Sequence, residues 1–142
     1  MENLFDVDKI LVVDDDRDIT EAICTFISSE FSHITTIKAY DGNEAIDEFE
    51  KHFPAIIILD IMLPKRSGFL VMEKIFRITG KGANKTAPPI IIVITGNPGL
   101  RHKVYGESLG AWQYIFKPFR MEKLCNYVRE ALTIIKQTES KR

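Results

Sequence analysis

Residues 9–16 read KILVVDDD, an apolar run that ends in three consecutive acids. A short aliphatic run of this kind is typical of a strand that is buried on both faces. Two further runs have the same form, because residues 55–60 read AIIILD and residues 90–95 read IIIVIT. The three runs predict the central strands of a sheet, and each ends in a polar side chain.

Two weaker strand candidates accompany the central three. Residues 34–39 mix apolar and polar side chains, and residues 113–116 form only a short run, so we expect both at the edges of the sheet. Apolar residues recur at helical spacing between the strands and after the last one. These helical patterns cover residues 19–27, 45–49, 71–78, 98–109 and 121–135, and the fourth is the weakest.

A strand followed by a helix therefore occurs five times. This alternation predicts an α/β fold, with a five-stranded, doubly wound parallel sheet in the order 2-1-3-4-5 and helices on both faces. We expect one domain over residues 9–136, after an N-terminal lead at 1–8 and before a polar C-terminal tail at 137–142. In such sheets the ligand lies at the carboxyl ends of the strands, where the strand order reverses.

Composition excludes several classes of function. The chain has 142 residues, and its 19 basic and 20 acidic side chains give a net charge of −1, so we expect no direct contact with nucleic acid. The aliphatic runs are too short to span a membrane, and the N-terminus lacks the apolar stretch of a signal peptide. The two cysteines, Cys24 and Cys125, have no CxxC spacing. We expect a reduced, cytoplasmic compartment.

Polar side chains follow four of the five predicted strands. They are the acids 14–16, Asp60, Thr95 and Lys117. Taken singly, an Asp at such a junction is a good helix cap, and a Lys-Pro pair is a common turn. In the predicted fold they converge on one crevice, where several carboxylates would repel one another unless a cation lay among them.

The chemistry of this set favours Mg²⁺ and phosphate. A few hard oxygen ligands suit Mg²⁺, which keeps some of its waters and binds phosphate oxygens. A carboxylate that faces Mg²⁺ and a lysine is arranged to attack phosphorus and form an acyl phosphate. The hydroxyl of Thr95 and the ammonium of Lys117 can receive the phosphoryl oxygens.

Four sequence blocks carry a resemblance to a known family. They read KILVVDDD at 9–16, LDIMLPKRSG at 59–68, ITG at 94–96 and GAWQYIFKPF at 110–119. In this order and spacing they resemble the receiver domain of the response regulators of two-component systems. The resemblance covers about residues 8–136 and implies a flavodoxin-like fold.

The resemblance implies a role for each acidic residue of the crevice. Asp60 corresponds to the phosphoacceptor. Asp15 would bind Mg²⁺ directly, Asp14 would act beside it through water or hydrogen bonds, and the backbone carbonyl of Met62 would be a further metal ligand. Asp16 stands where the family more often has Glu, and no ligand role follows for it.

The resemblance also implies a switch. Thr95 and Lys117 would hold the phosphoryl group, and Tyr114 corresponds to an aromatic residue whose ring turns inward as Thr95 moves toward the phosphate. The peptide bond between Lys117 and Pro118 is expected to be cis. The affected surface would be the weak helix at 98–109, the strand at 113–116 and the last helix.

Such a domain is a signalling module, and it is an enzyme only in catalysing its own phosphorylation and dephosphorylation. Its expected partners are a sensor histidine kinase or a phosphotransfer protein, and a downstream protein target or an output domain that this chain does not contain. The resemblance is also compatible with a dimer that forms on phosphorylation.

Two other interpretations remain open. A hydrolase of the haloacid-dehalogenase type also forms an aspartyl phosphate, but its Asp-x-Asp motif follows the first strand, and residues 60–63 (DIML) lack the second acid. A non-phosphorylated interaction module with a receiver fold would have lost an acid, the threonine or the lysine. This chain retains all of them, which favours the phosphorylated module.

Overall fold

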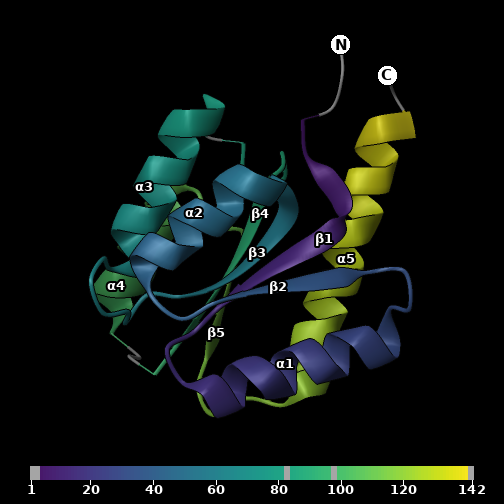
Figure 1. The fold of residues 1–142 in the computed structure, drawn as a ribbon. Helices are drawn as coiled ribbons and strands as arrows, with labels where there is room; N and C mark the ends of the chain where they lie inside the picture. The colour runs from purple at the N-terminus through teal and green to yellow at the C-terminus, as the bar shows by residue number, and fades with distance from the viewer. Residues whose placement is uncertain (1–3, 82–83, 97–98, 141–142) are drawn as a thin grey trace.

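The computed structural model describes residues 4–81, 84–96 and 99–140. Five strands and five helices alternate along this part of the chain, and the sheet lies between two layers of helices (Figure 1). The elements in chain order are β1 (Asp6–Val13), α1 (Arg17–Glu30), β2 (Thr35–Ala39), α2 (Gly42–His52), β3 (Pro54–Asp60), α3 (Gly68–Thr79), β4 (Ile90–Thr95), α4 (Leu100–Leu109), β5 (Gln113–Phe116) and α5 (Met121–Ser140).

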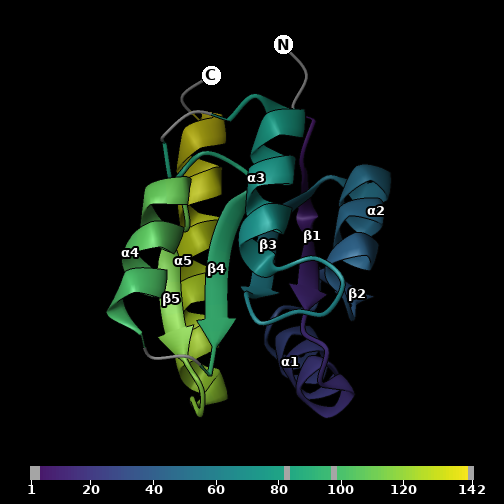
Figure 2. The same ribbon diagram turned by 90° about the vertical axis from the view of Figure 1, so that its left-hand side faces the viewer.

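The sheet topology confirms the predicted fold. All neighbouring strands are parallel, and their order is β2-β1-β3-β4-β5. The two weak strands β2 and β5 lie at the edges, as their composition predicted. Helices α1 and α5 cover one face, and α2, α3 and α4 cover the other (Figure 2). The strand order reverses between β1 and β3, so the carboxyl ends of these two strands form the crevice.

Alternation along the central strands divides the core into two parts. In β1, Ile10 and Val12 pack with α1 and α5, whereas Leu11 and Val13 pack with α2 and α3. All residues of β3 and β4 are buried. Because each face buries its own apolar set, a slip of one residue would exchange the two sets. This fixed register holds the polar residues at the strand ends in place.

Several boundaries differ from the predicted ones. Strand β1 begins at Asp6, within the expected N-terminal lead, and the Asp6 amide donates to the carbonyl of Phe53 at 2.7 Å. Helix α5 continues to Ser140, into the segment interpreted as a tail. Helix α4 begins at Leu100, and the predicted start at Pro98 lies outside the described residues. The peptide bond between Lys117 and Pro118 is cis, as expected.

No helix in the described ranges is both long and apolar enough to cross a membrane. Cys24 and Cys125 are both buried, and they pack in the core cluster between the sheet and helices α1 and α5.

Candidate phosphoacceptor and metal site

The turn after β1 separates the three consecutive acids. Asp14 points inward and is fully buried, and its Oδ1 accepts a hydrogen bond from the Asp16 amide at 2.9 Å. Asp15 is exposed. Asp16 is the N-cap of α1, and its Oδ1 accepts from the amides of Asp18 and Ile19 at 2.9 and 3.2 Å. The capping role explains why Asp16 turns away from the crevice.

Thr20 supports this turn and was not anticipated from the sequence. It is fully buried, and its hydroxyl donates to the backbone carbonyl of Asp14 at 2.9 Å. The available signal was its position on the buried face of α1, which it shares with Ile23 and Ile27. A hydroxyl on such a face needs a partner, and here the partner is the backbone of the acidic turn.

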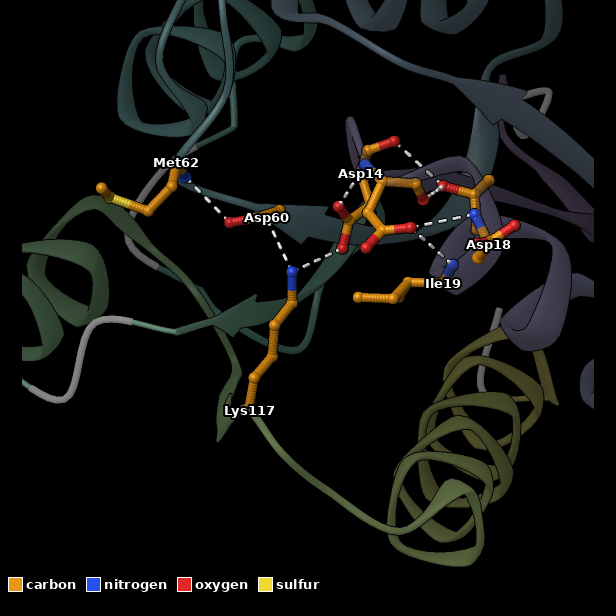
Figure 3. A network of polar contacts seen from close by, with 8 residues as sticks. Asp14, Asp18, Ile19, Asp60, Met62 and Lys117 are labelled. Atoms are coloured by element: carbon orange, nitrogen blue, oxygen red, sulfur yellow. Dashed lines mark hydrogen bonds and ion pairs between the residues drawn. The ribbon is translucent and has the colours of Figure 1, made fainter.

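Lys117 joins the two buried carboxylates. Its ammonium lies 2.7 Å from Oδ2 of Asp14 and 2.9 Å from Oδ2 of Asp60 (Figure 3). Asp60 ends β3 and is only 3% exposed, and its Oδ1 accepts a hydrogen bond from the Met62 amide at 2.8 Å. The strands β1, β3 and β5 thus bring together residues from three distant parts of the sequence.

The charges in this crevice are strongly coupled. Burial raises the pKa of Asp14, and the neighbouring negative charge of Asp60 adds to the effect, while Lys117 and the Asp16 amide oppose it. Burial alone would lower the pKa of Lys117, but its contacts with Asp14 and Asp60 raise that pKa overall. The raised pKa favours the charged form of Lys117, whose single positive charge offsets only part of the negative charge of the carboxylates.

The residues present fit a divalent cation. One carboxylate oxygen from each of Asp14, Asp15 and Asp60 lies within 4.8 Å of the other two. Oδ2 of Asp14 is buried, and its contact among the described residues is the ion pair with the Lys117 ammonium. A buried acceptor beside two further carboxylates is an arrangement that hard, oxygen-bound cations such as Mg²⁺ complete.

Thr95 lies on β4, the strand next to Asp60, and Tyr114 lies on β5, one strand further along the sheet. Thr95 is fully buried at the end of β4, one residue beyond Ile94, which pairs with Asp60 in the sheet. Tyr114 of β5 is 8% exposed, and its hydroxyl donates to the backbone carbonyl of His102 in α4 at 3.0 Å. The ring is thus buried against α4, and its predicted turning as Thr95 moves toward the phosphate stays a prediction.

Comparison with known proteins agrees with this geometry. The sequence model of the response regulator receiver domain matches residues 10–129. The chain belongs to the response regulator receiver family. Receiver domains are signalling domains, and the family works with histidine kinases and downstream targets.

Two curated regulatory proteins are similar to this chain in sequence. The chain is 36% identical over 125 residues to the regulatory protein VanR of Enterococcus faecium. This match covers 88% of this chain and 50% of VanR. It is 34% identical to the transcriptional regulatory protein CiaR of Streptococcus pneumoniae, over 82% of this chain and 47% of CiaR. The chain thus spans about half the length of the curated relatives it matches.

A solved receiver domain has the same fold. The CheY-like response regulator receiver domain protein from Methanospirillum hungatei superimposes with a TM-score of 0.78 and 26% identity, over 96% of this chain and all of that one. The two chains therefore share this fold over nearly their whole lengths.

The structure brings together most of the predicted site. Asp14, Asp15 and Asp60 share one crevice, and Lys117 reaches into it. The Met62 amide donates a hydrogen bond to the Asp60 carboxylate, whereas the role of the Met62 carbonyl as a metal ligand stays a prediction.

Proposed function

We propose that this receiver domain accepts a phosphoryl group on Asp60 and that the modification changes the surface formed by α4, β5 and α5. The observation that carries the proposal is the Lys117 ammonium, which contacts both buried carboxylates, Asp14 and Asp60. When the Asp60 carboxylate becomes an acyl phosphate, the Lys117 ammonium can remain bound at this site, because it can form new contacts with the phosphoryl oxygens.

The transfer step is a displacement at phosphorus. An oxygen of Asp60 forms a bond to the phosphorus of a phosphohistidine on the donor protein, and the phosphorus–nitrogen bond breaks with its electron pair returning to the imidazole. The Met62 amide and the Lys117 ammonium hold the carboxylate in one orientation before attack. The hydroxyl of Thr95 would then donate a hydrogen bond to a phosphoryl oxygen.

Asp14, Asp15 and Asp60, with the backbone carbonyl of Met62, would hold Mg²⁺. When bound, Mg²⁺ offsets the charge of the carboxylates and of the incoming phosphoryl oxygens. Asp15 is the exposed member of the cluster, so it is the group through which a hydrated ion can enter. Asp14, fully buried, fixes the inner side of the site.

An open depression beside Lys117 is our candidate for the docking site of the donor. It is lined by Ile19, Lys117, Pro118, Phe119 and Met121, with a volume of about 450 Å³. Its walls come from α1, from the turn between β5 and α5 and from the start of α5, and Lys117 connects it to the crevice. A mainly apolar contact surface there would let a sensor histidine kinase or a phosphotransfer protein approach Asp60.

Thr95 and Tyr114 are the proposed route from the site to the surface. Tyr114 lies under α4 and bonds to its backbone, so a movement of Thr95 toward the phosphoryl group would change how firmly the ring is held. Phosphorylation then shifts a balance between two arrangements that already exist. A downstream protein, or an output domain outside this chain, would bind the altered surface. A second copy of the chain could bind there too, which would give a phosphorylation-dependent dimer.

The proposal is tested by labelling the purified chain with a small acyl-phosphate donor. With Mg²⁺ present we expect the intact mass to increase by one phosphoryl group, and chelation of Mg²⁺ should prevent the increase. Asp60→Asn should remain unlabelled, because its amide is a poor nucleophile of nearly the same shape.

Full labelling of Asp60→Asn would refute Asp60 as the acceptor. If the wild-type chain takes up no phosphoryl group from the small donor or from a phosphorylated histidine kinase, the non-phosphorylated interaction module becomes the better account.

A further inference from the structure

The turn between β2 and α2 lies against the loop that follows Asp60. Gly42, the first residue of α2, is buried, and a Cβ atom there would overlap the carbonyl oxygen of Arg66 and lie 2.5 Å from the Cβ of Arg66. The backbone of α2 and the backbone of the β3–α3 loop therefore touch. Only glycine permits this approach, because the opposing atoms are backbone atoms of Arg66 and a Cβ fixed to that backbone, and none of them can swing aside.

The contact holds a strained turn. The Arg66 amide donates to the carbonyl of Pro64 at 2.7 Å, and Lys65 between them has a φ of 66°. A non-glycine residue in this left-handed region is held by its surroundings at a cost in free energy. The Gly42 amide also donates to the Pro64 carbonyl, at 3.4 Å, so the first residue of α2 contacts this turn directly.

A second close approach fixes the other end of the loop. The Gly68 amide donates to the carbonyl of Ile61 at 3.1 Å, and a Cβ on Gly68 would lie 2.7 Å from the Asp60 carbonyl oxygen. Gly68 thus contacts the start of the loop at 61–67, and Gly42 contacts its later part at Pro64 and Arg66. Met62, whose amide bonds to the Asp60 carboxylate, lies between these two contacts.

Neighbouring residues keep the start of α2 in place. Asp41 is the N-cap of α2, and its Oδ1 accepts from the Glu44 amide at 2.8 Å. Its other oxygen lies 3.5 Å from the ammonium of Lys65 in the strained turn. The guanidinium of Arg17 lies over the ring of Tyr40, 3.9 Å from its centroid. This contact connects the turn between β2 and α2 to the start of α1, which follows the acidic residues after β1.

From these contacts we infer that Gly42, held by its cap Asp41, is a positioning residue for the β3–α3 loop and thereby sets the affinity for Mg²⁺. The inference rests on the proposed function. Mg²⁺ demands near-ideal octahedral geometry, so its affinity is sensitive to small displacements of a ligand such as the Met62 carbonyl. Gly42 touches neither the metal nor the phosphoryl group, and it acts through residues 62–66.

The test compares Gly42→Ala with Asn43→Ala, an exposed neighbour in the same turn of α2. Mg²⁺ binding is measured by calorimetry, and hydrogen exchange of the Met62 amide is measured in Mg²⁺-free buffer. We expect Gly42→Ala to weaken Mg²⁺ binding by roughly tenfold, the loss that is usual when support behind a metal ligand is removed. Its Met62 amide should exchange faster, and Asn43→Ala should match the wild type in both measurements.

A second pair of variants covers the case in which Gly42→Ala does not fold. Asp41→Asn keeps a good helix cap and Asp41→Ala removes it, while both lose the same charge. We expect Asp41→Ala to bind Mg²⁺ several-fold more weakly than Asp41→Asn and to exchange the Met62 amide faster.

Each outcome decides the inference. Unchanged Mg²⁺ affinity and Met62 exchange in a folded Gly42→Ala protein would overturn it, as would identical behaviour of the two Asp41 variants. A wild-type protein that binds no Mg²⁺ would instead refute the proposed metal site, and the Met62 exchange rates would still decide whether Gly42 positions the loop.

Discussion

The three adjacent acids 14–16 have three different surroundings at the residue scale. Asp14 is buried against Lys117, Asp15 is exposed beside it, and Asp16 caps a helix. The identical side chains differ only in the direction that the backbone gives them. This separation makes the assignment of a metal ligand testable by single substitutions.

We expect Asp15→Ala to weaken Mg²⁺ binding by on the order of tenfold or more, because it removes a ligand. Asp16→Ala should leave Mg²⁺ affinity nearly intact and instead lower the free energy of unfolding by about 1 kcal/mol, the usual cost of a lost cap. Calorimetric titration and chemical denaturation of both variants separate the two effects. Equal losses of Mg²⁺ affinity would contradict the assignment.

Lys81 provides a prediction about pH dependence away from the site. Burial lowers its pKa to about 8, from an ordinary 10.5, although its ammonium bonds to the Pro89 carbonyl at 2.7 Å. Between these two pH values the unfolded chain binds more protons than the folded one, so this lysine makes stability rise with pH.

The contribution of Lys81 to this rise in stability should be absent from Lys81→Met, whose side chain keeps the packing on Phe76 but cannot titrate. The measurement is the free energy of unfolding of both proteins at neutral pH and at about pH 10. A difference between the two proteins that does not change with pH would show that the Lys81 pKa is not lowered by folding.

At the scale of elements, α4 is adapted to hold Tyr114. Gly106 lies in the interior of this helix, where glycine is unfavourable, and a Cβ atom there would be 2.6 Å from the Tyr114 hydroxyl oxygen. The missing side chain makes room for the inward ring. The hydrogen bond from Tyr114 to the His102 carbonyl then ties β5 to α4.

Gly106→Ala should therefore expel the Tyr114 ring while it favours the helix itself by about 1 kcal/mol. Burial raises the pKa of Tyr114 to about 12, so exposure should lower this pKa toward 10. A spectrophotometric titration detects the change, with Tyr114→Phe identifying the contribution of this phenol. A Tyr114 that still titrates near 12 in Gly106→Ala would contradict the account.

The central elements and the site residues on them were predictable, because aliphatic runs that end in polar residues mark buried strands and their carboxyl ends. Asp60 and Lys117 could thus be placed in one crevice from the sequence. The contacts of Gly42 and Gly106 could not, since they depend on which backbone lies opposite a missing side chain. The extension of α5 to Ser140 was also missed, because its last turns lack apolar residues.

At the scale of the whole molecule, the candidate site and the terminal elements lie at opposite ends of the sheet. The candidate site lies at the carboxyl ends of the strands, whereas the start of β1 and the end of α5 lie together at the opposite end (Figure 2). The curated relatives are about twice as long as the matched segment. In our proposal, Asp60 receives the signal at one end, and the face formed by α4, β5 and α5 carries it to a partner or an output domain.

The central claim is that Asp60, among three clustered carboxylates, is the residue that carries the phosphoryl group. Borohydride reduces an acyl phosphate of aspartate to homoserine, which marks the acceptor permanently. The chain is phosphorylated with Mg²⁺ and an acyl-phosphate donor, reduced, digested and sequenced by mass spectrometry. We predict homoserine at position 60 and unmodified aspartate at positions 14 and 15. Homoserine at either of those two positions, or at none of the three in a protein whose mass shows phosphorylation, would contradict the account.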